Sequence, residues 1–285
     1  MSALTSHVAL VSDTPSVPLE QVSPVAAALQ KQVTRDFGPL WSVNATVDAF
    51  DKLESVPVDY WPVILRDDIN QPGAAGYHTD NNGQPFSLVQ VDSGWPLTAS
   101  HETLEMLADP FGNRTIAGAL PPHAPKGLPK LHRVTYLVEV CDPCEADQFA
   151  YSANGVTVSD FITPNFYDPK AATGVRYSFG GNISKPHEVL DGGYVSFGNP
   201  VDNHWYQIIV QNGKAEVRDL GVIQANNGKS LRELVDAAVR EARKAEHYRT
   251  KPAKPSVLTA AAISPFADTS AGRAKRLRDY IKKLK

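Results

Sequence analysis

The chain has 285 residues, 42% of them hydrophobic and 21% charged, which is typical of a globular protein of one large or two small domains and excludes a disordered chain. Its net charge of −3 is unevenly distributed, because residues 271–285 carry seven basic side chains against one acid. No apolar run approaches the roughly 18–20 residues of a membrane span. The N-terminus has no basic segment followed by an apolar core, so we expect no secretory signal.

The first strands and helices are marked by apolar patterns. Residues 1–22 are rich in Ser, Thr, Pro and Val and predict an extended arm. Ser23 and Pro24 suit the start of a first helix, which ends near Gly38. Three strands are then expected over residues 41–50, 59–67 and 84–92.

The second half of the chain adds further strands and two helices. Its clearest strand covers residues 133–143. Asn212-Gly213 between two apolar runs predicts a hairpin, and Ser230 caps a helix over residues 230–248. The expected organisation is an N-terminal arm, an α+β domain, a linker and a basic helix over residues 1–22, 23–248, 249–271 and 272–285, respectively.

The cysteines are Cys141 and Cys144, in the sequence CDPC. A single C-x-x-C pair does not predict a structural zinc site, and the helix that follows a redox loop is not evident here. We therefore expect two unreactive thiols. This cysteine content fits a reducing compartment or a virion, so we expect a cytoplasmic or virion-associated protein.

One stretch carries the residue types of a hydrolytic metal site: LTASHETLEMLADP, residues 97–110. It predicts a short helix in which His101 and Glu105 project from one face, because residues four apart lie one turn apart. An imidazole and a carboxylate are suitable ligands for a divalent metal ion. Glu102, rotated by about 100°, has the place of a general base that takes a proton from the attacking water and passes it to the leaving amine. Alternatively, the acids are solvated residues that the helix dipole favours near an N-terminus.

Three segments resemble a group of uncharacterised bacterial and phage proteins. They are GAAGYHTDNNGQPFSLVQVD, LTASHETLEMLADP and YLVEVCDPCEADQFAYSANGVTVSDFITPNFYD, within roughly residues 60–210. That group has a Gly-Tyr-His segment, a Gly-x-Pro strand, a Ser-His-Glu helix ending in Asp-Pro and a Glu-Val-x-Asp-Pro strand in the same order.

The resemblance implies a zincin-like α+β fold and a metallopeptidase activity. Such a fold has a small mixed sheet and an active-site helix, followed here by a strand- and loop-rich region and C-terminal helices. The resemblance also implies that QPFSLVQV, residues 84–91, is the edge strand along which a peptide substrate lies by β-augmentation.

The sequence departs from the zincin signature His-Glu-x-x-His at Glu105, where zincins have a second His. A carboxylate there makes the site richer in oxygen, so zinc, calcium, magnesium and manganese all remain open. For the third ligand we prefer Glu139, because a carboxylate in an apolar strand is costly unless it is paired or metal-bound. Asp142 is the reserve. The alternative for Glu139 is a salt bridge to an arginine or to His101.

Two further histidines and the basic tail complete the candidates. His78 precedes the expected edge strand and either lines the cleft or is an exposed loop residue, whereas His204 is expected to be a packing or hydrogen-bonded residue. The basic C-terminal helix has an apolar stripe and predicts a protein or anionic partner, including nucleic acid, or else a solvated surface helix. The stripe consists of Leu277, Ile281 and Leu284.

These observations predict a metal-dependent peptidase or hydrolase with a peptide or protein substrate. Glu102 is the predicted base, and the predicted ligands of a divalent metal ion are His101, Glu105 and Glu139. The alternative is a non-catalytic structural or interaction protein on the same scaffold, for example within a phage particle or another large assembly.

Overall fold

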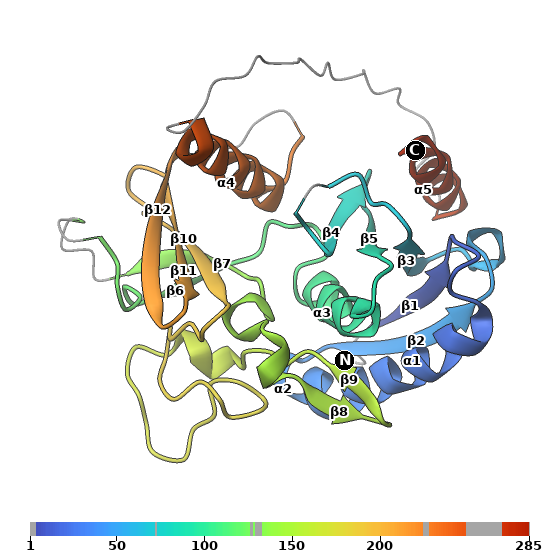
Figure 1. Ribbon diagram of the computed structural model, residues 1–285, viewed down its shortest axis with the longest axis horizontal. Helices are drawn as coiled ribbons and strands as arrows, with labels where there is room; N and C mark the ends of the chain where they lie inside the picture. Colours follow the sequence, from blue (N-terminus) through green and yellow to red (C-terminus); the bar gives the residue numbers. More distant parts are fainter. Residues whose placement is uncertain are drawn as a thin grey trace.

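The structure is a computed structural model that describes residues 4–71, 73–125, 128, 133–224, 228–248 and 270–284. Two five-stranded sheets, each with helices packed against it, form the two halves of the molecule (Figure 1). The α+β class predicted from the sequence is confirmed. Among the helices in the described part of the chain, none is long and apolar enough to cross a membrane.

The first sheet has the strand order β2-β1-β3-β5-β4. Strands β2, β1, β3 and β5 run parallel to one another, whereas β4 runs antiparallel to β5 and forms one edge of the sheet. The strands are β1 (Thr5–Ser12), β2 (Asn44–Phe50), β3 (Tyr60–Arg66), β4 (Gly76–Asn81) and β5 (Gln84–Gln90).

The prediction of an extended arm over residues 1–22 is wrong. Strand β1 lies at the centre of the sheet, paired with β2 on one side and β3 on the other, and Val8 to Val11 are fully buried. A parallel strand buried on both faces is a short continuous apolar run without alternation, and here the surrounding Ser, Thr and Pro residues obscured it. Helix α1 (Leu19–Lys31) also starts ahead of the predicted Ser-Pro pair.

At the β4 edge of the first sheet, the outermost strand is β4. Residues 84–91, which the resemblance implied as the edge strand, lie one strand further in. Those residues belong to β5, which is hydrogen-bonded to β3 on one side and to β4 on the other. Asn82 and Gly83 have φ values of 54° and 76° and form the two-residue turn between β4 and β5. Such positive φ angles at an Asn-Gly pair are typical of a tight hairpin.

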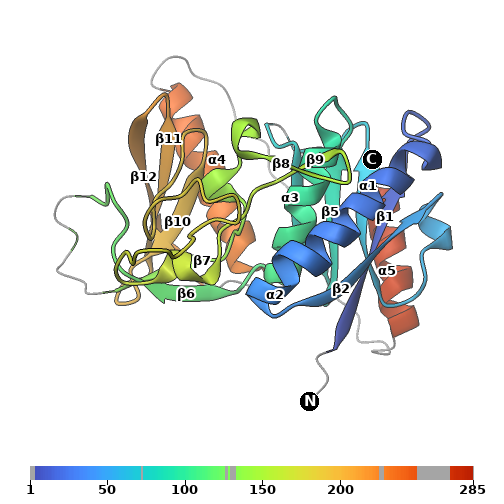
Figure 2. The same cartoon turned by 90° about the horizontal axis from the view of Figure 1, so that it is seen from below.

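Helices cover both faces of the first sheet (Figure 2). Leu10 of β1 packs toward α1 and α3, whereas Val11 packs toward α5, because successive residues of a strand point to opposite faces. The helical segments are α1, its π-helical continuation Gln32–Phe37, α2 (Gly38–Trp41) and α3 (Trp95–Ala108) on one face, and α5 (Ser270–Lys283) on the other.

Helix α5 is held to its own sheet by its apolar stripe. Leu277 and Ile281 are buried against β1, β3 and β5, and Tyr280 makes an edge-to-face contact with Phe86. The Arg66 guanidinium donates a hydrogen bond to the Ile281 carbonyl at 3.0 Å. The stripe is therefore covered within the chain. The basic side chains that remain exposed on α5 include Lys275, Lys282 and Lys283.

The second sheet is antiparallel, with the strand order β12-β11-β10-β7-β6. Helix α4 (Leu231–Tyr248) packs against its β12 side. The strands are β6 (Thr115–Gly118), β7 (Val134–Leu137), β10 (Tyr194–Gly198), β11 (His204–Gln211) and β12 (Lys214–Val222), and a small separate hairpin is formed by β8 (Tyr151–Ala153) and β9 (Val156–Val158).

Several local predictions are confirmed in this half. Asn212 and Gly213, with φ of 52° and 70°, connect β11 to β12. Ser230 caps α4 in a reciprocal capping box: its Oγ accepts the Glu233 N–H at 3.2 Å, and the Glu233 carboxylate accepts the Ser230 N–H at 2.8 Å.

The strand expected over residues 133–143 ends at Leu137. Residues 249–269 of the predicted linker lie outside the described residues.

The docking of α5 is testable by truncating its most buried side chain. Ile281 is fully buried, so Ile281→Ala leaves a cavity between α5 and the sheet, and we expect it to cost about 2–5 kcal/mol of unfolding free energy. Lys283→Ala on the exposed side of the same helix should cost less than about 0.5 kcal/mol. Urea denaturation of the full chain measures both. Equal stabilities of the two variants would show that α5 does not pack as described.

Candidate functional site

Helix α3 is fixed firmly along its buried face. The Ser100 hydroxyl donates to Gln32 Oε1 at 2.8 Å and accepts the Ser159 N–H at 2.9 Å. These two hydrogen bonds hold α3 against the π-helical continuation of α1 and against the chain after β9. At the C-terminal end, the Asp109 carboxylate accepts two backbone N–H groups of the following loop. Asp109 is thus a capping residue. The apolar side chains of Leu104, Leu107 and Ala108 on this helix are buried.

His101, Glu105 and Asp142 converge next to this helix. His101 Nε2 lies 3.3 Å from Glu105 Oε1 and 3.2 Å from Asp142 Oδ1, and one ligand atom from each residue lies within 4.8 Å of the other two. Asp142 starts a short 3-10 turn, and the N–H of the preceding Cys141 donates to Glu105 Oε1 at 3.2 Å. This backbone contact holds the turn against α3 and fixes the place of Asp142.

A second group of potential ligands shares Glu105. His78 on β4, Glu105 and Glu139 also place one ligand atom each within 4.8 Å. However, the Arg232 guanidinium at the start of α4 contacts all three. Its Nη1 bonds to His78, its Nη2 lies 3.6 Å from Glu105 Oε2, and its Nε lies 3.2 Å from Glu139 Oε1. The positively charged side chain of Arg232 therefore already contacts the three potential ligands of the second group.

The structure separates the predicted ligands. His101 and Glu105 lie together as predicted, and Asp142, the reserve ligand, completes the group around His101. Glu139, the preferred third ligand, belongs to the group around Arg232. Glu139 contacts Arg232, as the alternative expected, and as a metal ligand it stays a prediction within the second group. It does not join the group of His101. The reason is that the chain leaves the sheet after Leu137, so the turn that follows, and not the strand, reaches His101.

Burial controls the protonation of the neighbouring carboxyl groups. It raises the pKa of Glu102 to about 8, although the charges of His101 and Arg232 oppose it. It also raises the pKa of Asp142 to about 6 and that of Glu139 well above its usual range. These shifts share one cause: four carboxyl groups, those of Glu102, Glu105, Glu139 and Asp142, are buried around the cations of His101 and Arg232.

Glu105 is the exception. Burial raises its pKa too, but the charges of His101 and Arg232 outweigh burial and hold that pKa far below the usual range. For His101, burial lowers the pKa, yet the carboxylates of Glu105 and Asp142 outweigh it and raise the pKa well above its usual value. Glu105 is therefore the ionised centre of the site.

The donor atoms fit a divalent ion in the first group. Tetrahedral ligation at about 2.1 Å places ligand atoms about 3.4 Å apart, close to the 3.2 and 3.3 Å found around His101. Within the described part of the chain, the buried carboxylate oxygens that lack a hydrogen-bond partner include Asp142 Oδ1 in the first group, Glu105 Oε2 and both oxygens of Glu139 in the second, and Glu102 Oε2, which faces His78. Buried polar atoms are normally satisfied, so an excess of unsatisfied acceptors at one place points to a cation.

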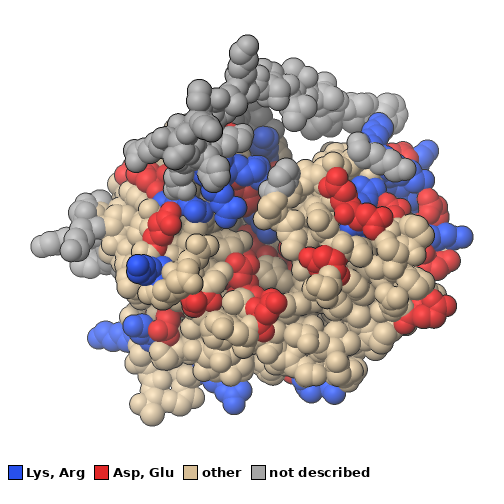
Figure 3. Space-filling model, viewed as in Figure 1, with Lys and Arg blue, Asp and Glu red and all other residues tan. Residues whose placement is uncertain are grey.

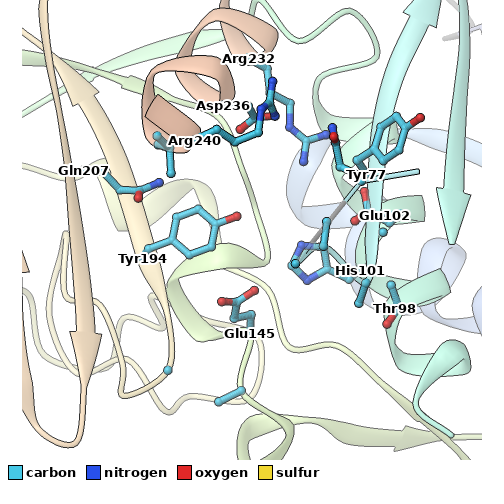
Figure 4. Close-up of a pocket in the computed structure, with 18 of the residues that line it drawn as sticks. Tyr77, Thr98, His101, Glu102, Glu145, Tyr194, Gln207, Arg232, Asp236 and Arg240 are labelled. Atoms are coloured by element: carbon cyan, nitrogen blue, oxygen red, sulfur yellow. The ribbon is translucent and has the colours of Figure 1, made fainter. Parts of the chain in front are cut away.

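The site opens on a cleft of about 480 Å³ between the two halves (Figure 3). His101 and Glu102 line one wall, and Tyr194 and Glu145 lie opposite (Figure 4). Strand β4 passes close above Glu102: a Cβ on Gly76 would lie 2.9 Å from Glu102 Cγ. Only glycine allows the edge strand to approach the helix this closely.

Two residues of the site were missed at the sequence level. His78 was left open between a cleft and a loop position, yet it is fully enclosed on β4, and the Asn82-Gly83 turn is the signal that places it there. Arg232 carried no signal, because an arginine near a helix start is ordinarily solvated. His204 is hydrogen-bonded to Asp219 at 2.6 Å, as expected.

The two cysteines are free and buried, in agreement with the prediction of unreactive thiols. Burial raises the pKa of both Cys141 and Cys144 well above the usual value, which disfavours the reactive thiolate.

Comparisons with protein-family models, with curated proteins and with solved structures found no match for this chain. The functional argument therefore rests on the geometry and chemistry of the site.

The raised pKa of Glu102 gives the metal-free protein a defined pH dependence. A carboxyl group with a pKa of 4.5 in the unfolded chain and about 8 in the folded chain stabilises the fold fully below pH 4.5 and loses this contribution as the pH rises through 8. The buried His78, whose pKa is lowered, adds no slope above pH 6.5, because it is neutral there in both states. We therefore expect the unfolding free energy to fall between pH 6.5 and about 9.

Urea denaturation in the presence of a chelator at these two pH values measures the slope. Glu139, Glu145 and His101, whose pKa values are also raised, add a slope of the same sign. Glu102→Gln should therefore reduce the slope without removing it, because the amide does not titrate, whereas Glu20→Gln on the exposed side of α1 should leave it unchanged. A slope that is as steep in Glu102→Gln as in the wild type would contradict the assignment to Glu102.

Proposed function

We propose that this chain is a metal-dependent hydrolase of the zincin-like class that cleaves peptide bonds. The observation that carries the proposal is the convergence of His101, Glu105 and Asp142 beside Glu102 at the wall of an open cleft. The edge strand supports it, because β4 lines the same cleft at Gly76 and an extended peptide added to a strand at the edge of a sheet gains main-chain hydrogen bonds. A peptide bound in this way passes Glu102.

The metal ligands in this proposal are His101 Nε2 and one carboxylate oxygen each from Glu105 and Asp142. An ion held there would act as a Lewis acid, polarising the scissile carbonyl and lowering the pKa of a water molecule. One imidazole with two carboxylates suits zinc or manganese better than calcium, which takes roughly six to eight oxygen ligands. Glu105 in place of a second histidine shifts the preference toward the harder of these ions.

Glu102 is the proposed general base. Its carboxylate lines the cleft next to His101 and does not belong to either ligand group. It accepts a proton from the attacking water as the water oxygen bonds to the carbonyl carbon. It then passes this proton to the amine nitrogen as the carbon–nitrogen bond breaks. A pKa of about 8 is close to the operating pH, which suits a group that must both accept and return a proton.

The second candidate is a non-catalytic scaffold, and one observation favours it. Arg232 contacts both Glu105 and Glu139 without any metal, so part of the acidic site is already stabilised by the protein itself. In this alternative the remaining carboxyl groups are protonated and need no metal ion, and the fold serves a structural or binding role within a larger assembly.

Metal content separates the two candidates. We expect the purified wild-type protein to bind one zinc or manganese ion. Asp142→Asn should weaken this binding by more than the roughly 10–100-fold that is typical when a residue that only hydrogen-bonds to a metal ligand is lost. Glu139→Gln is the matched control and should retain the ion, because Glu139 belongs to the Arg232 group. Titration calorimetry with elemental analysis measures both. A wild-type protein without an ion supports the scaffold and excludes the hydrolase.

Hydrolysis tests the role of Glu102. We expect metal-loaded Glu102→Gln to keep its ion and to cleave a fluorescent casein substrate about 10²–10⁴-fold more slowly than the wild type, because the amide cannot accept the proton. Unchanged turnover in this variant would exclude Glu102 as the base.

A further inference from the structure

Helix α4 presents a row of arginines to the cleft. Its apolar side, with Val235 and Val239 buried, packs on the second sheet, and this fixes the orientation of the helix. Residues 232, 236, 240 and 243 recur at intervals of three or four and line the cleft on the other side. Three of these four are arginines, and Asp236 is the one acid among them, so this wall carries net positive charge.

The arginines of this row differ in their surroundings. Arg232 is buried and its guanidinium is turned toward His78, Glu105 and Glu139. Arg240 and Arg243 are exposed and line the open part of the cleft, where Arg240 projects toward its interior (Figure 4). The second pair is therefore placed to meet a bound molecule.

The opposite part of the cleft is lined by acidic residues. Glu145 and Asp147 line it from the turns that follow Asp142, and Glu102 lies at its wall. Figure 3 shows acidic side chains around the hollow and basic side chains gathered along its α4 side. A ligand with negative charge along its whole length, such as a nucleic acid backbone, would gain no attraction from the acidic side. A peptide with a carboxylate at one place fits both sides.

We propose that the cleft selects peptides with a carboxylate group, which Arg240 and Arg243 bind on the α4 side of the scissile bond. Guanidinium groups pair with carboxylates through two parallel hydrogen bonds, which gives direction as well as attraction. The acidic side chain of a Glu or Asp residue and a free C-terminal carboxylate present the same chemistry. The placement relative to the scissile bond rests on the proposed function, but the binding of the carboxylate does not.

Binding can be measured without turnover. Full-length Glu102→Gln protein is titrated, with fluorescence anisotropy as readout, against a labelled peptide rich in glutamate with an amidated C-terminus. Two reference peptides have glutamine at the same positions, one with a free C-terminal carboxylate and one amidated. We expect at least one carboxylate-bearing peptide to bind about tenfold more tightly than the amidated glutamine peptide. The peptide that does so identifies the source of the carboxylate.

Charge reversal locates the contact. Arg240→Glu/Arg243→Glu should abolish the preference, because attraction becomes repulsion, and high salt should weaken it in the parent protein. Lys185→Glu is the matched control: Lys185 is exposed and does not line the cleft, so its reversal should leave the preference unchanged.

Equal binding of all three peptides would overturn the proposal, as would a preference that survives reversal of both arginines. If the preference is found while the wild-type protein cleaves none of the peptides, the carboxylate site stands and the proposed hydrolase fails. The two conclusions are thereby tested separately.

Discussion

The ionised carboxylate of Glu105 is the interaction on which the rest of the site depends. One oxygen faces His101 and the N–H of Cys141, and the other faces His78 and Arg232. A fully buried carboxylate is stable only when it is surrounded by cations and donors, so each neighbour is held in place by the same charge. Glu105 therefore does more than supply one candidate ligand, since an arginine and two further segments meet at its carboxylate.

Arg232 carries this constraint across the cleft. It belongs to α4, which packs on the second sheet, and it reaches β4 and α3 of the first half. Both walls are thus joined at the floor by a buried ionic contact, and the cleft stays open above it. Removing one partner of such a pair leaves an uncompensated charge and typically costs about 3–5 kcal/mol. This contact adds to the hydrophobic core that the two halves share.

The sequence predicted the parts of the structure that follow from local patterns. The His-Glu helix, the Asn212-Gly213 hairpin and the Ser230 cap are properties of short stretches, and they are present in the structure. Strand β1 and the edge strand β4 were not predicted. A central parallel strand lacks alternation, and β4 carries mixed polar residues whose only sign is the Asn82-Gly83 turn that follows.

The composition of the site was only partly predictable. His101 and Glu105 are one helical turn apart, so their proximity follows from helix geometry. Asp142 and Arg232 reach Glu105 through tertiary contacts, from segments 37 and 127 residues further along the chain. Spacing in the sequence carries no information about such contacts, and for this reason Glu139, in the more apolar stretch, was preferred over Asp142. The burial argument for Glu139 holds, since Glu139 is buried and Arg232 lies 3.2 Å from it.

The most direct test of this account is a crystal structure of the protein soaked in zinc or manganese, with anomalous scattering recorded at the absorption edge of the metal. The account predicts one peak about 2.1 Å from His101 Nε2 and from an oxygen each of Glu105 and Asp142, with Arg232 still in contact with Glu139. A peak bound by His78, Glu105 and Glu139 with Arg232 displaced, or no peak within the site, would contradict it.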